Sequence, residues 1–101
     1  MDITTRISHL KLRNPLILAS GFVDTTASSL VFAVKNGAGA VTCKSISIEP
    51  RKGHDSPVIA TLDSGLLNAV GLANPGLEES IEEIKLAKKR ISEPIIANVF
   101  A

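Results

Sequence analysis

Ala38-Gly39-Ala40-Val41-Thr42-Cys43-Lys44-Ser45 is the stretch that decides the fold, because an apolar run with strand character ends there in two polar side chains. An earlier apolar run, Leu16-Ile17-Leu18-Ala19, ends in the same way at Ser20-Gly21. Short continuous apolar runs are typical of strands that are buried on both faces. The two runs therefore predict neighbouring strands of a buried sheet, each followed by a polar loop.

A helix is predicted between these two strands. Asp24-Thr25-Thr26 offers capping side chains, and Asn36-Gly37 supplies a stop signal. The helix and its connections span about 20 residues, which is enough for a crossover between parallel strands. The apolar residues between the two signals recur at helical spacing, namely Leu30, Val31, Ala33 and Val34.

A second helix is predicted from Leu77 to Ile91, with Asn74 as its possible cap and Pro75 in its first turn. Its glutamates lie early on a solvated face and its lysines lie late, an order that complements the helix dipole. Glu93-Pro94 ends this helix, and the apolar run from Ile95 to Phe100 predicts a third parallel strand. The expected core face of the helix consists of Leu77, Ile81, Ile84, Ala87 and Ile91.

The complete pattern predicts an α/β fold. A short hairpin is expected between Ile3 and Leu12, and the long connection from Ser47 to Asp63 carries the strand-like run Val58 to Leu62. Hairpin, strand, helix, strand, long loop, helix and strand is an order that opens a (β/α)8 TIM barrel. Because such a barrel needs about 250 residues, we expect residues 1–101 to form the incomplete N-terminal segment of a single domain.

The composition excludes several classes of function. With a formal net charge of +1 and 3% aromatic residues, the chain offers neither a basic surface nor a stacking platform for nucleic acid. No apolar stretch approaches the roughly 18 residues of a membrane span, and the N-terminus lacks a signal-peptide layout. The single cysteine cannot form an internal disulfide. We therefore expect a cytoplasmic protein that binds neither nucleic acid nor a membrane.

Polar side chains follow each of the three predicted parallel strands, at Ser20-Gly21, Lys44-Ser45 and Asn98. Ligands bind at the carboxyl ends of the strands in such folds. Lys44 is either a ligand contact or a solvated lysine at a strand end. The Asn98 amide would cost about 1 to 3 kcal/mol if buried without a partner, so it needs a neighbouring loop or a ligand. The glycine-bearing loop from Asn68 to Gly76 is expected to converge with them on one face.

Two other residue types give no candidate site. Cys43 is predicted to be a small core residue, because an apolar neighbourhood raises the pKa of a thiol instead of activating it. His9 and His54 have no acidic or cysteine cluster near them in the sequence, so no metal site is predicted.

Several ordered motifs run along nearly the whole chain. They are Asn14-Pro15-Leu16-Ile17-Leu18-Ala19-Ser20-Gly21, Lys44-Ser45-Ile46-Ser47, Glu49-Pro50-Arg51-Lys52-Gly53-His54 and Gly65-Leu66-Leu67-Asn68-Ala69-Val70-Gly71-Leu72. With these motifs the chain resembles the dihydroorotate dehydrogenase family. The variants at Gly53-His54 and at residues 67–72 resemble the cytoplasmic, NAD-linked branch of the family.

This resemblance implies an FMN-containing TIM barrel that oxidises dihydroorotate to orotate in pyrimidine (UMP) biosynthesis. A partner subunit with FAD and an iron-sulfur cluster would pass electrons to NAD, so a homo- or hetero-oligomer is expected. By motif, the residues that would contact FMN are Ser20, Gly21, Lys44, Ser45 and Asn98. Those that would contact substrate are Lys44, Asn68, Ala69, Val70, Gly71 and Leu72.

The family's general base, a cysteine in this branch, lies on a later loop, so no catalytic residue is assigned within residues 1–101. We expect the 101-residue chain to be inactive by itself. Two alternatives stay open. One is a related FMN barrel that acts on another pyrimidine, as dihydropyrimidine dehydrogenase does. The other is a catalytically inert α/β fragment that serves as an assembly module.

Overall fold

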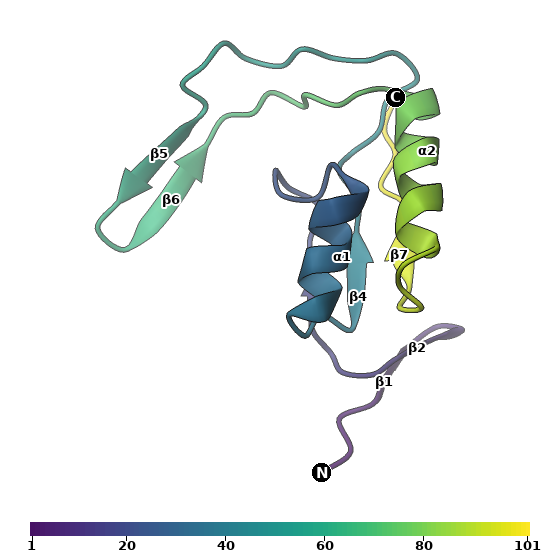
Figure 1. The fold of residues 1–101 in the computed structure, drawn as a ribbon. Coiled ribbons are helices and arrows are strands. Elements are labelled where there is room, and N and C mark those ends of the chain that lie inside the picture. The colour runs from purple at the N-terminus through teal and green to yellow at the C-terminus, as the bar shows by residue number, and fades with distance from the viewer.

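A computed structural model describes residues 1–101, which fold around a three-stranded parallel sheet (Figure 1). Strand β4 (Ala40–Thr42) lies between β3 (Ile17–Leu18) and β7 (Ile95–Ile96). The predicted order and parallel direction of the strands are confirmed. β7 ends four residues before the predicted limit, although an isolated parallel bridge joins Ile46 to Val99 further along.

Helix α1 (Ala27–Lys35) begins and ends at its predicted signals. Thr26 is the N-cap, and its side chain and that of Ser29 form a capping box. Asn36 is the C-cap, and Gly37 follows it with a φ of +110°, the left-handed conformation that favours glycine. Local sequence signals thus determine both ends of this helix.

Helix α2 (Leu77–Lys88) differs from its prediction in which residues face the core. Ala87 is buried as predicted, but Leu77 and Ile81 are exposed and Ser80 is buried instead. The Ser80 hydroxyl donates to Gly76 O at 2.6 Å, so a small polar residue can be buried with its hydrogen bond satisfied. Glu83 was also expected in solvent, but its carboxylate accepts from the Ala27 amide at the start of α1. It stabilises the positive end of that helix.

The core lies between the helices and one face of the sheet. Val41 and Cys43 belong to it, as predicted for Cys43. Because strand side chains alternate, Ala40 and Thr42 face the other side, which carries no helix. Ala40 and Val41 of β4 are buried, as predicted, but Thr42 and both residues of β3 are only half-buried. The buried core cluster consists of Ala27, Leu30, Val34, Val41, Cys43, Ile46 and Ala87.

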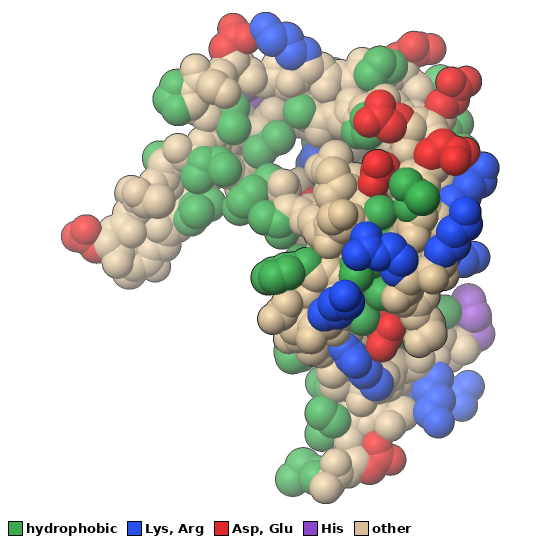
Figure 2. All heavy atoms as spheres, in the orientation of Figure 1, with side chains coloured by type: hydrophobic (Ala, Val, Ile, Leu, Met, Phe, Trp, Pro, Cys, Tyr) green, Lys and Arg blue, Asp and Glu red, His purple; other side chains and the backbone are tan.

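Two antiparallel hairpins lie outside this sheet. The predicted N-terminal hairpin is confirmed as β1 (Thr5–Ile7) and β2 (Leu10–Leu12). The second joins β5 (Ile59–Leu62) to β6 (Gly65–Asn68) and projects away from the helices (Figure 1). Hydrophobic side chains gather over this projection (Figure 2). β6 was not predicted, although a two-residue connection between two apolar runs is a hairpin signal.

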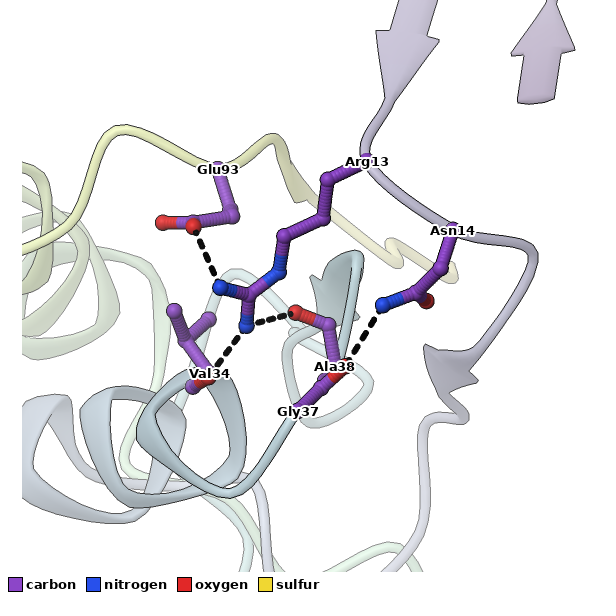
Figure 3. Close-up of polar contacts among 6 residues, drawn as sticks. All are labelled: Arg13, Asn14, Val34, Gly37, Ala38 and Glu93. Atoms are coloured by element: carbon purple, nitrogen blue, oxygen red, sulfur yellow. Dashed lines mark hydrogen bonds and ion pairs between the residues drawn. The ribbon is translucent and has the colours of Figure 1, made fainter. Parts of the chain in front are cut away.

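Arg13 fastens the N-terminal segment to the amino ends of β4 and β7 (Figure 3). Its guanidinium donates to Val34 O and Ala38 O and pairs with the Glu93 carboxylate at 3.3 Å. The Asn14 amide donates to Gly37 O at 2.8 Å beside it. These contacts satisfy carbonyl groups at the end of α1. They lie at the amino ends of the strands, whereas the polar residues follow the carboxyl ends.

We expect Gly39→Ala to lower the free energy of unfolding by about 2 kcal/mol, because overpacking a buried position forces a backbone shift. A Cβ at position 39 would lie 2.4 Å from the Asn14 carbonyl oxygen. Gly65→Ala is the matched control, since a Cβ there meets no atom within 4 Å. Urea denaturation of both variants checks this. Equal stabilities would contradict the assigned contact between Gly39 and Asn14.

Candidate functional site

The polar residues at the ends of the three parallel strands lie together. The Asn98 amide, which follows β7, donates to Ser45 Oγ at 2.8 Å. Ser20 Oγ, after β3, lies 3.3 Å from the same Ser45 Oγ. Ser45 is therefore the shared partner of side chains from both neighbouring strands. The sequence analysis required a partner for the Asn98 amide, either a neighbouring loop or a ligand. The structure supplies a protein partner, Ser45.

Lys44 is buried at the end of β4, with 9% of its surface exposed. Its backbone amide donates to Asp24 O at 3.1 Å. Its ammonium takes part in no ion pair or side-chain hydrogen bond within the chain. The stem of this lysine is therefore packed into the protein, which differs from a lysine that lies wholly in solvent. The Lys44 ammonium has no counter-charge within the chain, so it is available to an acceptor or an anion at the strand ends.

Asp24 was missed by the sequence analysis, which treated it only as a capping residue. It is fully buried, and its Oδ2 accepts from the Gly21 amide at 2.9 Å. Its Oδ1 has no hydrogen-bond partner. A side chain on Gly21 would meet no atom within 4 Å, so the space beside this backbone is open. Asp24 thus holds the Ser20-Gly21 turn in a position where a ligand can approach the main chain.

The loop from Asn68 to Leu72 begins at the end of the projecting β5–β6 hairpin (Figure 1). Asn68 is the last residue of β6 and is exposed. No hydrogen bond joins residues 68–72 to Ser20, Lys44, Ser45 or Asn98. The convergence of Asn68 with the other polar groups therefore stays a prediction, and Asn68 is the last residue of the unpredicted hairpin that projects from the sheet (Figure 1).

Backbone packing holds the 68–72 loop against the segment Gly53-His54. The His54 amide donates to Val70 O at 3.2 Å. Gly53 and Gly71 have φ values of +75° and +72°, and a Cβ on either would lie less than 3.0 Å from the opposite segment. Glycine is needed at both positions because the two backbones approach so closely.

Asn74 was predicted as a cap of α2, but Gly76 is the N-cap residue. The buried Asn74 side chain instead bonds to Ser47, Leu72 and Gly76. Its Asn-Pro-Gly context is a turn signal, but a turn signal does not reveal partners so distant in the sequence.

No helix of the structure combines the length and apolar character that crossing a membrane requires.

The profile of the family described as dihydroorotate dehydrogenase matches residues 2–101. The catalytic subunit of dihydroorotate dehydrogenase B (NAD(+)) from Thermoplasma acidophilum is 45% identical over 100 residues, which cover 99% of this chain and 33% of that protein. The corresponding subunit from Pyrococcus abyssi is 50% identical over 91 residues, or 90% of this chain and 30% of that protein. The chain thus spans about a third of the length of these relatives.

The crystal structure of DHODH in complex with ferulenol from Eimeria tenella superposes with a TM-score of 0.75 and 26% sequence identity. The match covers 97% of this chain and 28% of that one. The predicted fold class, the N-terminal part of a TIM barrel with an added hairpin, is confirmed by this likeness and by the parallel sheet.

Proposed function

Because the chain belongs to the dihydroorotate dehydrogenase family, we propose that it is the N-terminal segment of an FMN-dependent enzyme that oxidises dihydroorotate to orotate in pyrimidine biosynthesis. The observation that carries this proposal is Lys44, a largely buried lysine whose ammonium has no ion-pair partner, next in sequence to Ser45, which contacts Ser20 and Asn98. A cation with no counter-charge of its own suits a ligand that carries or develops negative charge.

The residues at the strand ends fit FMN chemically. Two hydroxyls and one amide can donate to or accept from the polar edge of a flavin ring. The open space beside Gly21 allows close approach to the main chain. We propose that Ser20, Gly21, Lys44, Ser45 and Asn98 hold this cofactor. FMN, when bound, would supply the oxidising power for removing two hydrogens across a carbon–carbon bond.

Lys44 would act on both ligands. Its ammonium would stabilise negative charge on the reduced cofactor and attract the substrate carboxylate. The Asn68 amide can both donate and accept along a pyrimidine edge, and Ala69, Val70, Gly71 and Leu72 would complete the substrate contacts. Asn68 borders an apolar hollow of about 290 Å³ on the β5–β6 hairpin. No residue of this segment is assigned as the general base, so we propose that the 101 residues alone are inactive.

The relatives are catalytic subunits of an NAD(+)-linked enzyme. We therefore propose a partner subunit with FAD and an iron-sulfur cluster that delivers electrons to NAD. A cytoplasmic location is part of the same proposal, and the free thiol of Cys43 suits a reducing compartment.

The test is flavin bleaching under anaerobic conditions. We expect dihydroorotate to bleach the flavin absorbance of the full-length protein, and the separate 101-residue chain to give no bleaching. Bleaching by dihydrouracil or dihydrothymine in place of dihydroorotate would contradict the proposed substrate. A 101-residue chain that binds and reduces flavin by itself would contradict the proposed division of the site.

A further inference from the structure

We propose that Asn74 is a positioning residue that sets the 68–72 loop relative to the residues after β4. This inference rests on the proposed function, because that function makes the 68–72 loop a substrate loop. The connection runs from Lys44-Ser45 through Ser47 to the Asn74 amide, and from that amide to Leu72. It is the direct side-chain link between the strand end and the loop.

The Asn74 side chain is 6% exposed, and its hydrogen bonds are complete. Nδ2 donates to Leu72 O at 2.9 Å and to Ser47 Oγ at 3.0 Å. Oδ1 accepts from the Gly76 amide at 3.0 Å and from the Ser47 amide at 3.2 Å. A buried amide with all its partners holds a single geometry, because each lost bond would leave a buried polar group unsatisfied.

The Leu72 backbone is the part of the loop that needs such a restraint. Leu72 has a φ of +58°, and it is one of only two non-glycine residues in the chain with positive φ. This conformation is unfavourable for leucine and persists only where neighbouring contacts impose it. The Asn74 amide binds the carbonyl of this residue. The position of the Asn74 amide therefore determines the conformation in which the 68–72 loop faces the proposed substrate.

The main chain of Asn74 adds a second attachment. Arg51 N donates to Asn74 O at 2.9 Å, and Asn74 N donates to Arg51 O at 3.0 Å. The guanidinium of Arg51 lies 5.6 Å from the centre of the Phe100 ring, after β7. Asn74 is thus anchored to segments that follow β4 and β7, and the anchored side chain in turn holds the loop.

Asn74→Asp in the full-length enzyme tests the role. The change keeps the shape and the accepting oxygen but removes the amide that donates to Leu72 O. We expect the KM for dihydroorotate to rise about tenfold while kcat and flavin content stay within about threefold, because uniform substrate binding is lost. The matched control is Asn36→Asp, which removes a comparable donation, to Phe32 O at 2.8 Å, at the exposed end of α1. It should leave KM unchanged.

An unchanged KM in Asn74→Asp with native flavin content would overturn the proposal. If that protein is recovered unfolded, Asn74→Ser takes its place, since its hydroxyl is one bond too short for the Leu72 carbonyl, and the same two outcomes decide. If wild-type enzyme does not respond to dihydroorotate, the proposed function fails, and hydrogen exchange then judges the positioning role. Faster exchange of amides 68–73 in Asn74→Asp than in Asn36→Asp supports it, and equal rates overturn it.

Discussion

Lys44→Ala is expected to lower kcat/KM for dihydroorotate by about a thousandfold in the full-length enzyme. The side chain is buried, and its ammonium has no partner within the chain. Its charge is therefore free to act on ligands at the ends of the parallel strands. Losing a preorganised cation removes stabilisation where negative charge develops. Steady-state kinetics with dihydroorotate, together with the flavin spectrum of the purified variant, measure the effect.

The matched control for this result is Lys52→Ala. Lys52 is the same residue type, but it is exposed and pairs only with exposed Asp55. Surface ion pairs of this kind contribute about 0 to 1 kcal/mol, so kcat/KM should stay within about twofold of wild type. A Lys44→Ala enzyme that also stays within twofold would show that the buried ammonium takes no part in the reaction.

The stability of the flavin-free protein separates function from structure at the same position. The Lys44 ammonium makes no ion pair within the chain that folding would lose, and Lys44→Met replaces the largely buried side chain with an apolar one of similar length. We expect the flavin-free variant to melt at the same temperature as wild type or higher. A clear fall in Tm would show that Lys44 is needed for folding, and the loss of activity would then need another explanation.

Sequence patterns predicted the framework well because they depend on local chemistry. The capping residues around α1 and the apolar runs of β3 and β4 need no knowledge of distant partners. The same holds for the polar residues after each strand. Parallel pairing brings strand ends to one edge, and the contacts of Ser45 with Ser20 and Asn98 agree with that expectation.

The errors arise where tertiary contacts outweigh local signals. Ser80 is buried in place of Ile81, because Ser80 has a backbone acceptor at Gly76 and α1 packs on that side. Asn74 looks like a helix cap in sequence, but its partner Ser47 lies 27 residues away. The charge balance of α2 could not reveal that Glu83 accepts from Ala27. The position of each of these side chains depends on a neighbouring residue that the helical periodicity of the sequence does not identify.

Gly53→Ala is expected to lower kcat/KM for dihydroorotate by about a hundredfold with flavin content retained. A Cβ at this position would lie 2.2 Å from Val70 O and 2.7 Å from the Ala73 side chain. The Val70 carbonyl belongs to the 68–72 loop, so the clash can be relieved only by separating the two backbones. A displacement of about 1 Å in a substrate-positioning element can cost about a hundredfold in rate. Steady-state kinetics with dihydroorotate measure this loss.

Backbone strain at Gly53 must be separated from this clash, because Gly53 has a φ of +75°. Gly37→Ala is the appropriate control, since Gly37 has a φ of +110° but a Cβ there meets no atom within 4 Å. Strain alone should lower stability by about 1 to 2 kcal/mol in both variants. Only Gly53→Ala should also lose activity. If the two variants have equal activities, any loss of activity in Gly53→Ala is explained by strain alone. The contact between Gly53 and Val70 would then not position the loop.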